Sequence, residues 1–108
     1  LNEIALKSKA GIKIVEKNIP LKQEVASICE LLGFDPLYLA NEGKLLAFVA
    51  PQDADQVLEI ICQNEFGHDA AIIGEVVEDY PGRVYMETRI GGTRIVDMLV
   101  GEQLPRIC

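Results

Sequence analysis

The sequence predicts an α+β fold, an α/β/α sandwich in which helices pack on a mixed sheet of four to five strands. Three observations lead to this prediction. Continuous apolar runs alternate with apolar stripes at helical spacing, a period-two segment follows them, and turn residues separate the elements. The 108 residues, of which 49% are hydrophobic and 25% charged, suit a single globular domain with one core.

Three segments carry apolar residues at the spacing of a helix. The chain opens directly in such a pattern, for which Gly11 is the expected stop. Pro20 stands near the start of a second helix that ends at Gly33, and Pro51 opens a third helix that closes at Gly67. The side chains expected to face inward from the second and third helices are Leu21, Val25, Ile28, Cys29 and Leu32, and Ala54, Val57, Leu58, Ile61 and Cys62.

The predicted strands are short apolar or alternating runs bounded by turn residues. They are Ile12–Glu16, Leu45–Ala50, Ala70–Val77, Val84–Ile90 and Arg94–Met98. The second and third are continuously apolar, which is typical of strands buried on both faces, and we expect the third to be central. The fourth alternates apolar with polar residues and predicts a half-exposed strand. A tight turn at Gly91-Gly92 joins the fourth strand to the last.

Charge and hydropathy argue against several classes of function. With 17 acidic and 10 basic residues the net charge is −7, which disfavours a nucleic-acid binder and adsorption to an anionic membrane. No apolar run approaches the roughly 18–20 residues that cross a bilayer, and no signal peptide is visible. Three cysteines without short spacing indicate neither a disulfide framework nor a zinc site. We therefore expect a cytoplasmic protein.

The chain is expected to form one domain over residues 1–100, followed by a mobile tail over residues 101–108. It begins at Leu1 without methionine, inside a helical pattern that no Ser, Thr, Asp or Asn precedes as a cap. A natural domain rarely starts this way. We therefore interpret the sequence as a fragment whose upstream residues are missing.

Several residues have both a structural and a functional interpretation. Cys29 and Cys62 fall on inward helix stripes, where cysteine packs as a small apolar side chain. His68 is the only histidine and stands at a helix-to-strand junction, which favours a loop or capping role over metal binding. The segment Gly91-Gly92-Thr93 can cradle a phosphate with its amides, but without a strand–loop–helix context a hairpin turn is favoured.

The segment Asn41-Glu42-Gly43-Lys44 precedes a predicted strand. It is expected to form a β-turn in which Gly43 adopts a positive φ. Glu42, at the mouth of that strand, is also a candidate general base. The spacing alone does not decide whether Glu42 has a catalytic role.

The C-terminal tail carries the strongest candidate, Cys108. Pro105 keeps the tail extended, so the terminal thiol should reach solvent. An exposed thiol is prone to oxidation, which favours a nucleophile over an accidental chain end, although that alternative stays open. The adjacent α-carboxylate disfavours the thiolate and Arg106 favours it. The thiol therefore needs a reactive partner, or a partner's base, to be acylated.

Four segments of the chain resemble a known protein family. They are the run from Gly92 to Leu99, the tail from Gly101 to Cys108, and the upstream blocks 41–44 and 73–76. Together they resemble the HypE family of hydrogenase expression/formation proteins, the carbamoyl dehydratases of NiFe-hydrogenase maturation. The resemblance covers essentially the whole chain, and its most specific part is the terminal Pro-Arg-Ile-Cys. It implies the fold of the C-terminal domain of aminoimidazole ribonucleotide synthetase. That superfamily, which includes selenophosphate synthetase, shares the fold but not the terminal cysteine.

The resemblance also implies a cycle that makes cyanide. The carbamoyltransferase HypF places a carbamoyl group on the terminal thiol, ATP with Mg²⁺ drives dehydration to a thiocyanate, and the cyano group passes to iron on the HypC–HypD scaffold complex. Cys108 is then the carrier nucleophile and Glu42 the candidate base for the amide proton. To these we add Arg106 as a candidate contact to the phosphates. Full-length relatives are homodimers.

One departure from the family pattern limits what the fragment can do. The family's ATP-binding domain and its Asp-x-Thr-Arg-Gly-Gly segment lie upstream of this region and are missing here. We therefore expect the fragment alone to bind no cofactor or metal and not to be a competent dehydratase. Two alternatives stay open: a small-ligand-binding or regulatory α/β domain in which Cys108 is incidental, and the C-terminal domain of another ATP-dependent synthetase of the superfamily.

Overall fold

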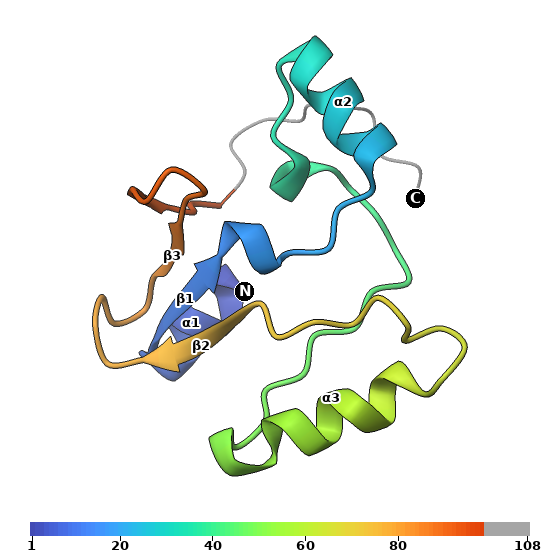
Figure 1. Ribbon diagram of the computed structural model, residues 1–108. Helices are drawn as coiled ribbons and strands as arrows, with labels where there is room; N and C mark the ends of the chain where they lie inside the picture. Colours follow the sequence, from blue (N-terminus) through green and yellow to red (C-terminus); the bar gives the residue numbers. More distant parts are fainter. Residues whose placement is uncertain (99–108) are drawn as a thin grey trace. The chain divides into compact units, whose positions relative to one another are not determined.

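The structure, a computed structural model, describes residues 1–98 (Figure 1). The α-helices of this part of the chain are α1 (Asn2–Ser8), α2 (Gln23–Leu32) and α3 (Ala54–Cys62). The strands are β1 (Gly11–Val15), β2 (Gly74–Val77), β3 (Val84–Glu87) and β4 (Thr93–Ile95). The predicted α+β class with a mixed sheet is therefore confirmed. Two compact units divide the described chain: Leu1–Pro20 with Ala50–Met98, which contains the whole sheet, and residues 21–49.

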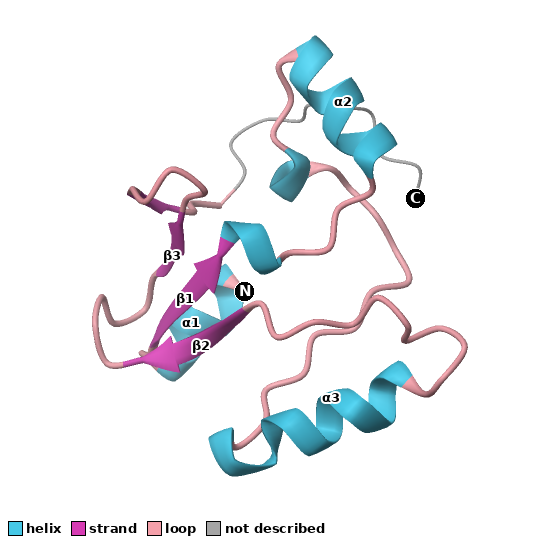
Figure 2. Cartoon of the chain, viewed as in Figure 1, coloured by secondary structure: helices cyan, strands magenta, loops and turns pink. Residues whose placement is uncertain are grey.

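The four strands form one mixed sheet in the order β2-β1-β3-β4 (Figure 2). β1 pairs antiparallel with β2 and parallel with β3, and β4 returns antiparallel to β3. The parallel pair places Ile12 opposite Val84 and Ile14 opposite Met86, so these four side chains share one face of the sheet. All four are buried, as is Ala5 of α1, and they form the centre of the core of this unit.

The prediction of a buried strand at Leu45–Ala50 is wrong. The segment has no regular secondary structure, and the side chain of Leu45 is 84% exposed. An apolar run sets the character of the side chains but supplies no hydrogen-bonding partner for the backbone. Within the described residues, no strand of the sheet pairs with this segment.

The predicted central strand Ala70–Val77 is wrong in length and in place. Only Gly74–Val77 forms a strand, β2, and β2 lies at the edge of the sheet, where Val76 is 55% exposed. β1 and β3 occupy the centre instead. A glycine at position 74 is needed because a Cβ there would collide with the carbonyl oxygen of Lys13.

The prediction of a half-exposed strand at Val84–Ile90 is wrong in length, because β3 ends at Glu87, and its expected open face is only partly exposed. Tyr85, on the face expected to be open, is only 8% exposed. Its ring meets the ring of Tyr80 edge-on, with centroids 5.0 Å apart. Glu87 on the same face forms an ion pair with Lys13 of β1 at 3.2 Å. On the face that alternation marked as exposed, Tyr85 is therefore buried while Glu87 remains 45% exposed.

Other element ends follow the sequence signals more closely. Gly33 ends α2 with φ +71°, and its amide donates to the carbonyl of Cys29. The tight turn at Gly91-Gly92 is confirmed by the β3–β4 hairpin. The expected stop of the first helix at Gly11 is wrong: α1 ends at Ser8 with Lys9 in the left-handed conformation. Gly11 begins β1, where a Cβ would collide with the carbonyl of Asp79.

The inward stripes of the two longer helices are only partly covered. Cys29 of α2 is buried, but Ile28 and Leu32 of the same predicted stripe are more than half exposed. α3 ends at Cys62, before the expected stop at Gly67. The predicted inward residues of α3 are half-buried, whereas Ile60 outside the stripe is 60% exposed. Helical periodicity thus finds the less exposed face of α3 but not how fully that face is buried.

Candidate functional site

Two of the three predicted site residues, Cys108 and Arg106, lie outside the described residues, as does the whole predicted tail over residues 101–108. Their roles therefore stay predictions from the sequence. The third, Glu42, belongs to the unit formed by residues 21–49 and is exposed.

A turn presents Glu42 to solvent. Gly43 has φ +80°, as predicted for this block, and nothing lies within 4 Å of the position of an added Cβ. Asn41 donates a hydrogen bond from Nδ2 to the carbonyl oxygen of Leu39 at 3.0 Å, which holds the approach to the turn. The predicted strand after the turn is absent, so Glu42 stands before an irregular segment rather than at the mouth of a strand.

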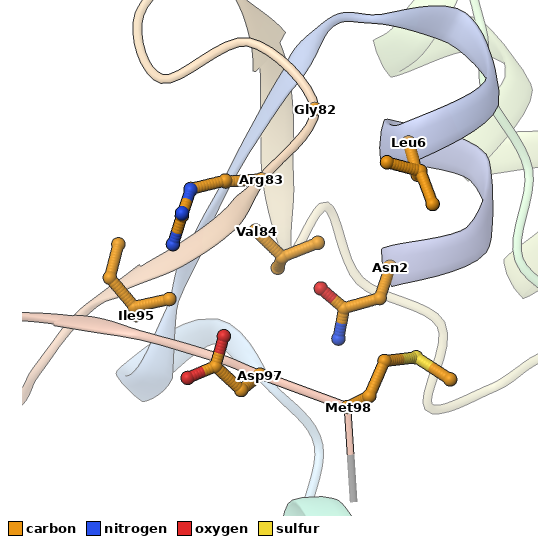
Figure 3. Close-up of a pocket in the computed structure, with 8 residues that line it drawn as sticks. All are labelled: Asn2, Leu6, Gly82, Arg83, Val84, Ile95, Asp97 and Met98. Atoms are coloured by element: carbon orange, nitrogen blue, oxygen red, sulfur yellow. The ribbon is translucent and has the colours of Figure 1, made fainter.

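Within the unit that contains the sheet, a surface pocket of about 280 Å³ lies beside α1 and the start of β3 (Figure 3). It is lined by three polar residues, Asn2, Arg83 and Asp97, and by five others, Leu6, Gly82, Val84, Ile95 and Met98. The lining residues come from α1, from the turn before β3, and from the segment that includes the end of β4.

The turn at residues 79–82 positions one wall of this pocket. Tyr80 and Gly82 have positive φ angles of 49° and 78°, and the Arg83 amide donates to the Tyr80 carbonyl at 3.1 Å. The Gly82 amide donates to the carbonyl of Ala10, which ties the turn to the chain just before β1. These bonds place Arg83 at the rim and send Val84 into the core.

The pocket is an open hollow of mixed lining. A guanidinium, a carboxylate and an amide stand beside apolar side chains, so hydrogen-bonding groups are present at this surface. None of its lining residues is a nucleophilic Ser, Thr, Cys or Lys. Sequence reasoning missed this pocket, because its residues come from segments that only the folded sheet brings together and form no local motif.

The cysteines and the histidine behave as the structural interpretations predict. Cys29 is buried and Cys62 is half-buried, and both are free thiols. Nδ1 of His68 lies 3.0 Å from the carbonyl oxygen of Cys62, the last residue of α3. Because a carbonyl can only accept, Nδ1 is the donor, and the imidazole caps the end of the helix. Among residues 1–98, no group of three or more His, Cys, Asp or Glu side chains is arranged to hold a metal ion.

The turn after β3 does not form a phosphate cradle. The amide of Gly91 donates to the carbonyl of Thr88, and the amide of Gly92 donates to Thr88 Oγ1, both at 3.0 Å. A phosphate loop needs free backbone amides that converge on the ligand. These amides are already used within the turn, so this segment does not fit the phosphates of ATP.

An ion pair joins Lys13 and Glu87 on the sheet. Lys13 Nζ lies 3.2 Å from Glu87 Oε2 across the β1–β3 pair. The hydrogen bond and the attraction from the Glu87 carboxylate raise the pKa of Lys13 above its ordinary value of 10.5. This ion pair joins the two central strands. Neither Lys13 nor Glu87 lines the pocket.

The described helices are too short or too polar to cross a membrane. The fold defines the chain as an α+β domain with a mixed four-stranded sheet. The chain belongs to the family described as AIR synthase related protein, C-terminal domain, which matches residues 1–87. The expected fold type is therefore confirmed.

Sequence relatives narrow the resemblance further. Over 108 residues the chain is 58% identical to "Carbamoyl dehydratase HypE" of Rhizobium leguminosarum bv. viciae. It is 43% identical over the same length to the protein of the same name from Escherichia coli strain K12. The match covers all of this chain but only 31% and 32% of those two proteins. The chain thus spans about a third of the length of the curated relatives it matches.

Solved structures agree with the sequence relatives. A crystal structure of hydrogenase maturation protein HypE matches 100% of this chain and 36% of its own, with a TM-score of 0.91 and 44% identity. HypE in complex with ATP matches with a TM-score of 0.90 and 43% identity, over 100% of this chain and 33% of its own. HypE in a HypE–HypF complex matches 90% of this chain and 31% of its own, with a TM-score of 0.83 and 46% identity. The resemblance to the HypE proteins is therefore confirmed.

Proposed function

We propose that this chain is part of an ATP-dependent carbamoyl dehydratase that makes the cyanide ligands of NiFe hydrogenases, with Cys108 as the carrier. The observation that carries the proposal is the 58% identity to a carbamoyl dehydratase over all 108 residues, the terminal cysteine region included. The match of the wider family to residues 1–87 would not by itself indicate which reaction the protein catalyses.

The chemistry of the proposal balances as a dehydration. The Cys108 thiol takes a carbamoyl group to give an S-carboxamide. ATP transfers a phosphoryl group to the carboxamide oxygen, because an amide oxygen is a poor leaving group. Two protons leave the nitrogen, the C–O bond breaks, and phosphate departs to leave a thiocyanate. The net products are thiocyanate, ADP, phosphate and one proton. Passing the cyano group to iron regenerates the Cys108 thiolate and takes up two electrons, which the iron-bearing acceptor complex has to supply.

Glu42 is the proposed base for the amide proton. Its carboxylate stands on an exposed turn, where it can meet a substrate group brought by another part of the protein. Arg106 is the proposed contact for the phosphate that leaves. Residues 101–108 are proposed to act as a carrier tail, which must visit a transferase, a site for ATP and an acceptor.

The proposed partners follow from the same reaction. A solved HypE–HypF complex is among the similar structures, and we propose HypF as the carbamoyl donor for the full-length protein. A HypE structure with ATP supports ATP, with Mg²⁺, as its substrate. We further propose that the HypC–HypD complex accepts the cyano group. The proposal also includes a homodimeric state and a cytoplasmic location for the full-length protein.

Mass spectrometry of the full-length protein tests the carrier role. After reaction with carbamoyl phosphate, ATP and the carbamoyltransferase, the adduct should appear on the peptide that contains Cys108. The peptides of Cys29 and Cys62 are internal controls and should stay unmodified, since these thiols are buried or half-buried. Cys108→Ser should abolish the adduct and reduce hydrogenase maturation in cells to background. Full maturation with Cys108→Ser would contradict the proposal.

A further inference from the structure

The segment before Glu42 is anchored to α2 within the unit formed by residues 21–49. The amide of Phe34 donates to the carbonyl of Cys29 at 2.9 Å, and Cys29 is the buried residue of α2. A short 3₁₀ helix, Pro36–Tyr38, follows and contacts α2. Phe34 and this short helix are half-buried. The chain therefore enters the turn of Glu42 from a segment that is held against a helix.

The side chain of Asn41 connects this anchored segment to the turn. Its Nδ2 donates to the carbonyl oxygen of Leu39 at 3.0 Å, and the Leu39 amide donates to the carbonyl of Pro36 at 3.3 Å. These two bonds lead from the 3₁₀ helix to the residue directly before Glu42. Asn41 is exposed, so its bond competes with water and adds little to global stability. Its main effect is to restrict the local conformation of the chain.

Gly43 restricts the chain on the other side of Glu42. Its φ is +80°, in the left-handed region that side chains of L-residues rarely adopt. Nothing lies within 4 Å of the position of an added Cβ, so the glycine meets a conformational need and not a lack of space. Both neighbours of Glu42 therefore favour one backbone conformation, and the residue between them is exposed.

A fixed conformation matters for a general base. The base has to meet the proton that it removes at hydrogen-bond distance and in a suitable orientation. In the proposed reaction one N–H bond of the S-carboxamide breaks and its proton moves to the Glu42 carboxylate. Because the carboxamide is brought by a tail, the carboxylate has to be in place when the substrate group arrives. A displaced carboxylate slows this step without weakening the binding of ATP.

We infer that Asn41 and Gly43 are positioning residues for the dehydration step. They hold the turn in the conformation in which the Glu42 carboxylate reaches the carboxamide proton. Asn41 acts through its bond to the Leu39 carbonyl and Gly43 through its positive φ. The inference rests on the proposed function, because it takes Glu42 as the base.

Single-turnover dehydration of the carbamoylated full-length protein tests the role of Asn41. Asn41→Ala should lower the rate at saturating ATP by about ten- to a hundredfold, the size expected for a misplaced reacting group. The ATP concentration that gives half the maximal rate, and the rate of Cys108 carbamoylation, should stay unchanged. Asn41→Ser, whose hydroxyl can donate to the same carbonyl, should restore most of the rate.

Two substitutions test the conformation of Gly43. Both side chains have room, because the space around this position is open. Gly43→Asn should keep most of the dehydration rate, since asparagine adopts the left-handed conformation more readily than other L-residues. Gly43→Val should lose as much rate as Asn41→Ala, since a β-branched residue opposes a positive φ. Equal rates for the two substitutions would overturn the role of Gly43.

Asn64→Ala is the matched control. Asn64 is also an exposed asparagine with a local side-chain bond, since its Oδ1 accepts from the Phe66 amide at 2.9 Å. It follows α3 in the other unit and has no part in the turn of Glu42. The dehydration rate of Asn64→Ala should equal that of the wild type.

A double substitution separates positioning from a direct role. In a Glu42→Gln background, Asn41→Ala should cause no further loss, because both changes act through one carboxylate. A further loss there would overturn the inference, since Asn41 would then contact the substrate itself. A normal rate with Asn41→Ala alone would also overturn it and leave Glu42 as the base. Normal dehydration by Glu42→Gln alone would remove Glu42 from the proposed function, and the inference with it.

Discussion

Single residues at the centre of the sheet show how burial sets stability in this chain. Met86 and Val84 are the largest side chains that are fully buried, and both lie on the central strand β3. They face Ile14 and Ile12 of β1 across the parallel pair. Because this core is small, each methylene in it carries a large share of the apolar burial.

Met86→Ala should lower the free energy of unfolding by about 2–5 kcal/mol, because it removes apolar contacts and leaves a cavity. Urea denaturation of the 108-residue chain measures the change. Met98→Ala is the matched control, since Met98 is 59% exposed, and it should change stability by less than about 0.5 kcal/mol. Equal effects of the two substitutions would contradict the core described here.

Glu42→Gln in the full-length protein should slow the ATP-dependent dehydration of the carbamoylated thiol by about 10²–10⁴-fold, the usual contribution of a general base. Carbamoylation of Cys108 should proceed at the normal rate, because that step does not use this proton transfer. Single-turnover assays that follow carbamoyl and cyano adducts by mass separate the two steps. Normal dehydration by the variant would remove Glu42 from the proposed mechanism.

At the scale of elements, β1 and β3 are joined by more than their backbone ladder. Lys13 and Glu87 form an ion pair across the two strands, and Glu16 at the end of β1 reaches the hairpin loop. Local signals predicted the hairpin turn and the C-terminal end of α2 correctly, whereas α2 begins at Gln23 and not at the expected Pro20. They did not predict that Tyr85 of β3 is buried, because alternation reports side-chain polarity and not what covers each face.

The Lys13–Glu87 pair should make stability depend on pH at the alkaline end. The folded pKa of Lys13 is raised above the ordinary 10.5, so its stabilising contribution is complete below pH 10.5. The contribution is lost as pH rises through the folded pKa. Urea midpoints of the wild type and Lys13→Gln should therefore differ below pH 10.5 and converge above the folded pKa. A difference that persists undiminished at high pH would show that Lys13 acts through packing alone.

At the scale of the whole molecule, the chain leaves much apolar surface uncovered. Leu31, Leu45 and Phe66 are each more than 80% exposed. The chain also spans only about a third of the relatives it matches. The described residues supply a sheet, a small pocket and an exposed carboxylate, but the turn at Gly91-Gly92 has no amides to spare for phosphates.

The 108-residue chain incubated with ATP and Mg²⁺ should release no phosphate above the buffer rate, even when Cys108 has been carbamoylated beforehand. The reason is that the turn at Gly91-Gly92 offers no free amides for phosphates and the chain spans only about a third of the relatives it matches. A colorimetric phosphate assay measures the rate, and the full-length protein serves as the positive control. Turnover by the short chain near the full-length rate would show that its own residues suffice.

The sequence by itself determined the fold class, the helices α2 and α3, the hairpin turn and the family resemblance, because caps, periodicity and terminal motifs are local signals. Only the tertiary structure decided which strands are central, since strand order depends on pairings between distant segments. It also decided that Leu45–Ala50 is not a strand, and it assembled the pocket from separate segments. Burial is a property of the neighbours that a segment finds, and the sequence of one segment does not contain them.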